Sequence, residues 1–457
     1  MSHFKRVLTL LTCIVSLSTL ACVTAPAAER TDRRPNVVLI MADDFGYECV
    51  GANGGTSYKT PTLDKLAAGG VRFTHGYSQP LCTPTRVQLM TGKYNVRNYV
   101  QFGLLDTEQT TFAQLFKKAG YATCIAGKWQ LGREVTLPAH FGFDEHCLWQ
   151  LSRRPERYKN PGLEVNGKEV DYTKGEYGPD IVNAYALDFI SRKKDQPFLL
   201  YYPMMLTHDP HTPTPDSSDW DQPAAEKVKN KKAGKAKKQP GEPKQRHFAD
   251  MTAYMDKLIG KLVTRLDELG LRENTLILFL GDNGTGKGVV SQMGGTSVPG
   301  GKGLANDGGM HVPMIANWPA VMKSGSVSHD LVDSTDFLPT ICQAAGIDVP
   351  ADLHIDGRSF LPQLQGKPGQ PREWIYCWYA RDGGAQASHE FARNQRYKLN
   401  RQGVLFDISG GDHDDKPLDA NKLTPEAVAA GKTLQAALDQ FSTARPAKLA
   451  RAKAAKQ

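Results

Sequence analysis

Apolar runs and amphipathic segments alternate over the first part of the chain. Residues 36–41 (NVVLIM) and 275–280 (TLILFL) are almost continuously apolar, as is typical of strands buried on both faces of a sheet. Strands that alternate with helical segments predict an α/β fold, with a mostly parallel sheet sandwiched by helices. We expect further strands at residues 121–126 and 198–202, and helices at residues 62–68, 111–119 and 246–269.

The pattern changes after Gly366, where the apolar runs become short. We expect antiparallel strands and one helix there, at residues 374–379, 397–399, 404–408 and 425–441. The sequence therefore predicts a main domain over residues 35–366, which holds the candidate chemistry, and a small C-terminal α+β subdomain of antiparallel strands and a helix over residues 371–445.

The N-terminus has the features of an export signal. Lys5 and Arg6 precede an apolar run, and small residues follow up to residue 28. This pattern predicts a secretory signal peptide over residues 1–28, and the run is too short for a spanning helix. We expect an exported protein, periplasmic or extracellular, without a transmembrane segment. Thr19 stands where lipoprotein signals prefer Leu, which argues against lipid anchoring at Cys22.

The net charge of +8 is unevenly distributed. Much of it lies in a Lys-rich insert at about residues 222–245 and in a basic tail at residues 446–457. Both segments have too few apolar residues to offset the entropy of ordering, which predicts a solvated loop and tail. The alternative is that the insert attracts a polyanion. We expect no nucleic-acid partner, because the chain has no nucleic-acid-binding motif.

Acidic residues follow two of the predicted strands. Asp43 and Asp44 come just after the first buried strand, and Asp282 and Asn283 come just after the strand at residues 275–280. Ligands of open α/β sheets bind beyond the carboxyl ends of the strands. Carboxylate and amide oxygens select a hard cation, so we expect Ca²⁺, with Mg²⁺ as the alternative ion.

Cys82 begins the most distinctive motif of the chain. The sequence Cys82-Thr83-Pro84-Thr85-Arg86 is followed by an apolar turn and Thr-Gly. Taken alone, the pentapeptide also fits a buried structural Cys beside a turn proline. With the acidic pairs, it resembles the signature of the type I sulfatases (formylglycine-dependent, arylsulfatase-like enzymes of the alkaline phosphatase-like superfamily). In that family a maturation enzyme oxidises the Cys to Cα-formylglycine.

The resemblance implies a metal site and a catalytic set. Gly127-Lys128-Trp129 and Gly301-Lys302-Gly303 match segments in which the family has a sulfate-binding Lys, and a Pro-His segment contains His211. The implied metal ligands are Asp43, Asp44, Asp282, Asn283 and the modified Cys82. The implied catalytic residues are Cys82, Arg86, Lys128, His211 and Lys302.

Three positions depart from the family pattern. Thr85 stands where the family often has Ser, which is a mild change. The other two are expected to bind substrate. Gln130 replaces a common His after Lys128-Trp129, and His311 replaces a common Arg. Glutamine can hydrogen-bond a hydroxyl but cannot take its proton. His208, three residues before His211, either supplies the missing base or only lines the substrate subsite, and the sequence leaves both open.

These features predict a sulfuric ester hydrolase. We expect it to remove sulfate from a sulfated carbohydrate through a formylglycine nucleophile and a bound Ca²⁺, after processing by a formylglycine-generating maturation enzyme. Two alternatives stay open. One is a phosphonate or phosphate ester hydrolase on the same scaffold, because formylglycine serves both reactions. The other is an inactive sulfoglycan-binding protein, because Gln130 replaces a basic side chain.

Overall fold

The structure is a computed structural model that describes residues 34–221, 242–410 and 415–451. The predicted signal peptide, Cys22, most of the Lys-rich insert and the end of the basic tail lie outside the described residues. Within the described ranges, no helix has both the length and the apolar character needed to cross a membrane.

A ten-stranded sheet forms the centre of the molecule. Its strands run in one direction except for β11 and β5, which are antiparallel to their neighbours. The predicted mostly parallel sheet is therefore confirmed. In spatial order the strands are β12 (Ser326–Asp333), β2 (Val71–Tyr77), β11 (Met314–Asn317), β8 (Thr275–Gly281), β1 (Asn36–Ala42), β7 (Phe198–Pro203), β3 (Ala122–Lys128), β4 (Glu145–Trp149), β5 (Gly162–Val165) and β6 (Lys168–Asp171).

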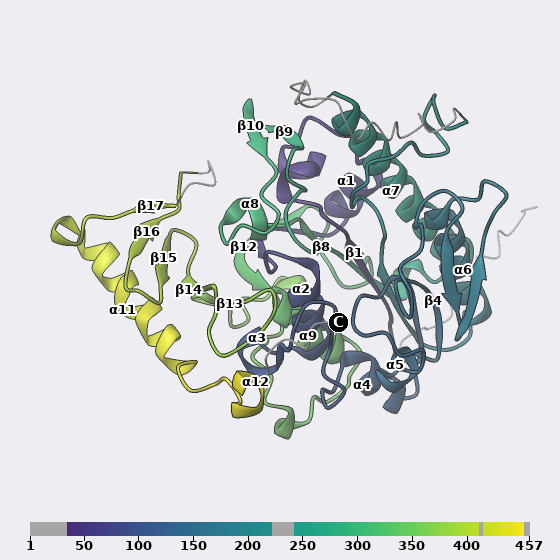
Figure 1. Ribbon diagram of the computed structural model, residues 1–457. Coiled ribbons are helices and arrows are strands. Elements are labelled where there is room, and N and C mark those ends of the chain that lie inside the picture. The colour runs from purple at the N-terminus through teal and green to yellow at the C-terminus, as the bar shows by residue number, and fades with distance from the viewer. Residues whose placement is uncertain (1–33, 222–241, 411–414, 452–457) are drawn as a thin grey trace, which may run out of the picture. The chain divides into compact units, whose positions relative to one another are not determined.

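Helices cover both faces of this sheet, because its central strands are apolar on both sides. Alternate residues of β1 enter two separate cores: Val37, Leu39 and Met41 belong to one, and Val38 and Ile40 to the other. Figure 1 shows two groups of helices with the strands between them. The first core contains α2 (Cys82–Thr91), α4 (Phe112–Lys118) and α9 (Phe337–Ala344), and the second contains α1 (Pro61–Ala68), α6 (Gly178–Arg192) and α7 (Glu242–Glu268).

Shorter elements fill the connections between these layers. A two-stranded hairpin is formed by β9 (Val290–Met293) and β10 (Thr296–Pro299). The remaining short helices are α3 (Asn95–Asn98), α5 (Leu137–His140), α8 (Asp307–Met310), α10 (Leu361–Leu364) and α12 (Ala447–Arg451).

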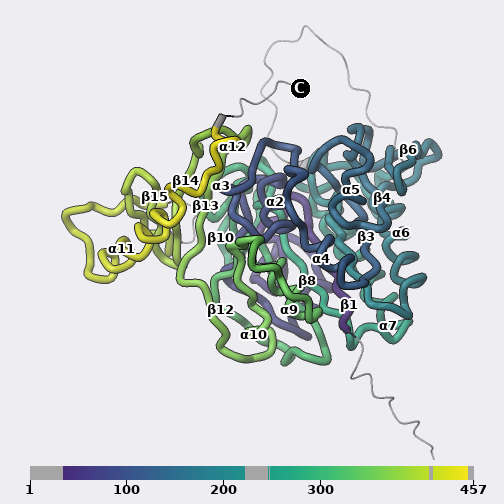
Figure 2. Tube along the Cα trace, turned by 90° about the horizontal axis from the view of Figure 1, so that it is seen from below, coloured from purple at the N-terminus to yellow at the C-terminus, as the bar shows by residue number. Residues whose placement is uncertain are grey.

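A five-stranded antiparallel sheet follows in the C-terminal part, with α11 (Pro425–Gln440) packed against it. Figure 2 shows α11 beside β14 and β15 at the yellow end of the chain. The predicted antiparallel strands and helix are confirmed, although the sequence did not reveal β14, whose residues are largely polar. The strands are β13 (Ile375–Tyr379), β14 (His389–Arg393), β15 (Tyr397–Asn400), β16 (Leu405–Asp407) and β17 (Lys416–Pro417).

Both sheets contribute to one core. Tyr376 and Trp378 of β13 belong to the same buried cluster as Leu39 of β1, and the chain from Arg34 onward forms one compact unit. The domain boundaries at residues 366 and 371 therefore stay a prediction.

A buried ion pair fixes the start of the second sheet to the first layer of helices. Arg372, just before β13, donates from Nε to Oδ2 of Asp336 at 2.8 Å and from Nη1 to the Tyr94 hydroxyl at 3.2 Å. Asp336 directly precedes α9 and is 2% exposed. Loss of the guanidinium would leave a buried carboxylate without its counter-charge.

We predict that Arg372→Met lowers the free energy of unfolding by about 3–5 kcal/mol, because the Asp336 carboxylate stays buried and unpaired. Urea denaturation followed by circular dichroism measures this change. Arg396→Met is the matched control, because Arg396 pairs with Glu426 at an exposed site and such pairs contribute about 0–1 kcal/mol. Equal losses in the two variants would contradict the prediction.

Candidate active site

The site lies where three parallel strands end at the same edge of the sheet. Asp43 follows β1, Asp282 follows β8, and Lys128 is the last residue of β3. Cys82 is the first residue of α2. Because the carboxyl ends of parallel strands share one edge, residues that are distant in sequence become neighbours there.

The predicted oxygen ligands converge. One donor atom each from Asp43, Cys82 and Asp282 lie within 4.8 Å of one another. The main-chain N–H of Asp44 donates to Asp282 Oδ1 at 3.0 Å, and Asn283 Nδ2 donates to Asp44 Oδ1 at 2.9 Å. The structure therefore brings together the metal-ligand set that the sequence predicted, in a buried position.

A basic side chain contacts each of the three carboxylates. Lys128 Nζ lies 2.9 Å from both oxygens of Asp43, and Lys302 Nζ lies 2.6 Å from Asp44 Oδ2. Arg86 donates from Nη2 to Asp282 Oδ2 at 3.1 Å and from Nη1 to the main-chain oxygen of Lys128 at 2.9 Å. These contacts offset the cost of burying the carboxylates.

Two of the carboxylates differ in their pKa. Burial would raise the pKa of Asp43, but Lys128 and the other nearby cations hold it well below its usual range. For Asp282, burial and the negative charge of Asp43 raise the pKa to about 7, against the opposing effect of Arg86. Asp282 is therefore protonated more readily than Asp43.

The donor set fits a hard divalent cation. Asn283 Oδ1 is buried and has no hydrogen-bond partner, so this oxygen is available as a ligand. The other donors are carboxylate oxygens, which Ca²⁺ and Mg²⁺ prefer. A cation beside Asp282 would favour the ionised form of this carboxyl.

Cys82 is held as a neutral thiol. It is 1% exposed, and its Sγ donates to Gln130 Oε1 at 2.8 Å. Burial raises the pKa of the Cys82 thiol, with Lys128 opposing this effect. A thiolate rather than a thiol is the reactive form of cysteine, so the unmodified side chain is a poor nucleophile here.

Thr85 stands where the family often has Ser, and the structure explains why the change is tolerated. Thr85 Oγ1 donates to the main-chain oxygen of Asp282 at 2.6 Å and accepts from the main-chain N–H of Gln79 at 2.9 Å. Both contacts need only a hydroxyl, so α2 keeps its attachment to the end of β8.

The structure brings His208 to the site, whereas the contact seen for His211 is with an aromatic ring of α7. His208 Nε2 lies 3.1 Å from Lys302 Nζ and 3.8 Å from Asp44 Oδ2. The ring of His211 packs edge-to-face against Phe248 of α7, with centroids 5.2 Å apart. The catalytic role predicted for His211 stays a prediction.

His311 is stacked between two tyrosines. Its ring lies 4.0 Å from that of Tyr47 and 5.1 Å from that of Tyr77, centroid to centroid, and Nε2 contacts the main-chain oxygen of Thr74 at 2.9 Å. Burial lowers the pKa of His311 to about 4. The ring is therefore neutral at pH 7 and cannot supply the charge of an Arg. Its predicted substrate contact stays a prediction.

Arg157 is a site residue that sequence reasoning missed. Its guanidinium stacks on Trp149 at 3.9 Å, and Nη1 lies 3.9 Å from Asp43 Oδ2. Arg157 is 5% exposed, and Nη1 has no hydrogen-bond partner. It belongs to the segment Ser152-Arg153-Arg154-Pro155-Glu156-Arg157, whose charges are typical of a solvated loop, so no sequence signal distinguished it.

Comparison with known proteins shows one family over most of the chain. The Sulfatase family profile matches residues 35–347, and the profile of N-sulphoglucosamine sulphohydrolase, C-terminal, matches residues 301–417. Arylsulfatase A of Homo sapiens is 30% identical over 92% of this chain and 91% of that protein. N-acetylgalactosamine-6-sulfatase of Homo sapiens is 32% identical over 81% of this chain and 74% of that protein. The crystal structure of Ps i-CgsB in complex with k-i-k-neocarrahexaose has a TM-score of 0.74 at 27% identity, covering 93% of this chain and 96% of that one.

We predict that Ca²⁺ stabilises the folded protein, because the buried oxygen set exists only in the native state. A 100-fold excess of Ca²⁺ over its dissociation constant should add about 2.7 kcal/mol, seen as a higher melting temperature that chelation reverses. Asp282→Asn should weaken this shift. Asp250→Asn should leave it intact, because Asp250 belongs to a separate cluster with Asp219 and His247. An undiminished shift in Asp282→Asn would place the ion elsewhere.

Proposed function

The chain belongs to the sulfatase family of enzymes, and from this we propose that it removes sulfate from a sulfated carbohydrate. The proposed nucleophile is formylglycine derived from Cys82, and the proposed ligands of Ca²⁺ are Asp43, Asp44, Asp282 and Asn283. The observation that carries the proposal is the buried cluster in which Cys82 lies within 4.8 Å of two carboxylates. Hydrated formylglycine would supply the attacking hydroxyl, and Ca²⁺ would polarise that group and the sulfate.

Basic side chains around the cluster would hold the sulfate. Lys128 and Arg157 are buried beside Asp43, and Lys302 is 20% exposed beside Asp44. Preorganised cations stabilise the charge that develops on sulfate oxygens in the transition state, and they do so most strongly where water is excluded. The first turn of α2 adds main-chain N–H groups next to position 82.

We assign the leaving-group proton to the contact between Lys302 and His208. His208 Nδ1 lies 2.7 Å from the main-chain oxygen of Asp209, so a hydrogen on Nδ1 is donated there and Nε2 accepts from the Lys302 ammonium. The pair thus holds a transferable proton between Nζ and Nε2. This assigns His208 a role on the leaving-group side, in place of the predicted role of His211.

Gln130 is the hydrogen-bond acceptor at position 82. Its Oε1 would orient a hydroxyl at that position but could not remove the proton. A base for the release of sulfate is therefore assigned to none of the described residues.

Sulfate esters are favoured over the alternatives. The two curated relatives described above are sulfatases, which supports sulfate over phosphonate or phosphate esters. An inactive sulfoglycan-binding protein would not need the buried carboxylates of Asp43 and Asp282 to be grouped with Cys82. Export and processing by a formylglycine-generating enzyme are part of the proposal, because the nucleophile cannot form without that enzyme.

Cys82 should be converted to formylglycine in protein made together with the maturation enzyme. Mass spectrometry of the tryptic peptide from Phe73 to Arg86 detects the conversion as the mass lost when the thiol side chain becomes an aldehyde. Cys82→Ala should abolish sulfate release and leave the circular dichroism spectrum unchanged. Active protein in which residue 82 is entirely unmodified would refute the proposal.

His208→Ala should lower kcat by about 10²–10⁴-fold on sulfate esters of alkyl alcohols, because such leaving groups need a proton. The loss should be much smaller on 4-nitrophenyl sulfate, whose leaving group departs without one. His211→Ala is the matched control and should not change this dependence on the leaving group. The assignment fails if His208→Ala slows both substrates equally, or if His211→Ala shows the larger dependence.

A further inference from the structure

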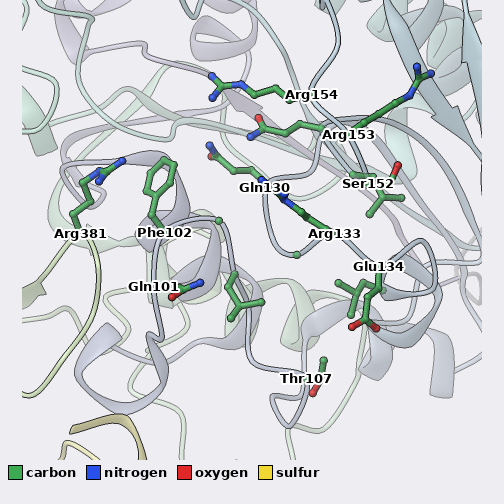
Figure 3. A pocket seen from close by; sticks show the side chains of 16 residues that line it. Gln101, Phe102, Thr107, Gln130, Arg133, Glu134, Ser152, Arg153, Arg154 and Arg381 are labelled. Carbon is green, nitrogen blue, oxygen red and sulfur yellow. The ribbon is translucent and has the colours of Figure 1, made fainter. Parts of the chain in front are cut away.

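A cavity of about 480 Å³ opens next to the active site. Three segments line it, within residues 101–107, 130–137 and 150–154, and Arg381 from the C-terminal part completes the wall. In Figure 3 the labelled arginines are seen on different sides of Gln130. None of these residues other than Gln130 belongs to the predicted site.

The lining carries excess positive charge. It contains four arginines and one acidic residue, Glu134. Arg153 is already paired with Glu169 and Asp171, and Arg381 with Asp382.

Two of the four arginines are uncompensated. Arg133 and Arg154 are exposed and form no ion pair with any residue that the structure describes. The cavity lining therefore includes two guanidinium groups without an ion-pair partner among the described residues, although Arg154 also lies over the Trp149 ring, 5.9 Å from its centroid.

The rest of the lining suits a sugar. Gln150 Oε1 is buried without a hydrogen-bond partner and is available to a hydroxyl. The Phe102 ring lies 5.1 Å from the Arg381 guanidinium and provides an apolar surface. Amide side chains together with an aromatic face and a few convergent charges are typical of sites that fix the orientation of a small polar ligand.

The cavity adjoins the reacting centre through Gln130. Gln130 lines it and also accepts the hydrogen bond from Cys82 Sγ at 2.8 Å. Gln130 and Gln150 follow β3 and β4 and are joined by a main-chain hydrogen bond of 3.4 Å. A sugar whose ester lies at position 82 would thus place its neighbouring substituents against the arginines.

We propose that this cavity is a subsite for a second anionic group, a carboxylate or a further sulfate, on the saccharide whose sulfate ester is cleaved. The inference rests on the proposed sulfatase function and adds the class of substrate. Arginine binds planar carboxylates and sulfates through paired N–H groups. A cleft lined by one sign of charge also raises the local concentration of a polyanion, an effect that salt screens.

The test uses two pairs of disaccharides that carry the same sulfate ester. One pair differs by a uronate carboxylate against its reduced alcohol, and the other by the presence of a second sulfate. The protein with Cys82→Ala should bind the anionic member of at least one pair about tenfold more tightly in calorimetry. The pair that shows the preference identifies the anion. Arg133→Gln combined with Arg154→Gln should remove that preference.

Arg265→Gln is the matched control, because Arg265 is a partly exposed arginine on α7 whose ion pair is with Glu268. It should keep the preference. Equal binding of both members of both pairs, or the same loss for anionic and neutral members in the double variant, would overturn the subsite. Since binding is measured without turnover, failure of the proposed function is distinct: processed enzyme would release no sulfate although the preference persists.

Discussion

The active-site end of the sheet depends on the balance between three buried carboxylates and three basic side chains. Burying a carboxylate costs several kcal/mol unless a counter-charge and hydrogen bonds replace water. Here Lys128, Lys302 and Arg86 provide the counter-charges, and each comes from a different segment of the chain. The positions of the strand ends and of α2 therefore depend on one another.

This balance also connects the metal site to the substrate. The pKa of Asp282 is raised by burial and by the charge of Asp43, so the cluster tolerates more positive charge. A bound cation would favour the ionised form of these carboxyls and add positive charge to the cluster. Under the proposed function, this added charge would lower the repulsion between the carboxylates and a sulfate ester.

Gln130 joins the reacting centre to the arginine-lined cavity. Its side chain contacts Cys82, and its neighbour across the strands is Gln150. Gln130 lies between the reacting centre and the cavity. Because its side chain is an amide, it can form hydrogen bonds there but cannot gain or lose a proton. Under the proposals above, this side chain would contribute to specificity, and the contact between His208 and Lys302 would supply the leaving-group proton.

The sequence by itself determined the sheet and the family, and it predicted most of the residues that the structure groups at the end of the sheet. Residues 36–41 and 275–280 are apolar on both faces. Such strands are stable only where helices cover both faces of the sheet. The acidic residues directly after them had to meet at one edge, and Cys82 with Pro84 and Arg86 supplied the motif.

Only the tertiary structure decided which loop residues enter the site. His208 and His211 share one short segment, and its path alone turns the first toward Lys302 and the second toward Phe248. The sequence around Arg157 is typical of a solvated loop. In the structure its guanidinium is instead buried against the Trp149 ring. The ends of strands can be predicted because the repeating pattern of apolar residues is local in the sequence. The positions of loop side chains depend on long-range packing, which produces no periodic pattern in the sequence.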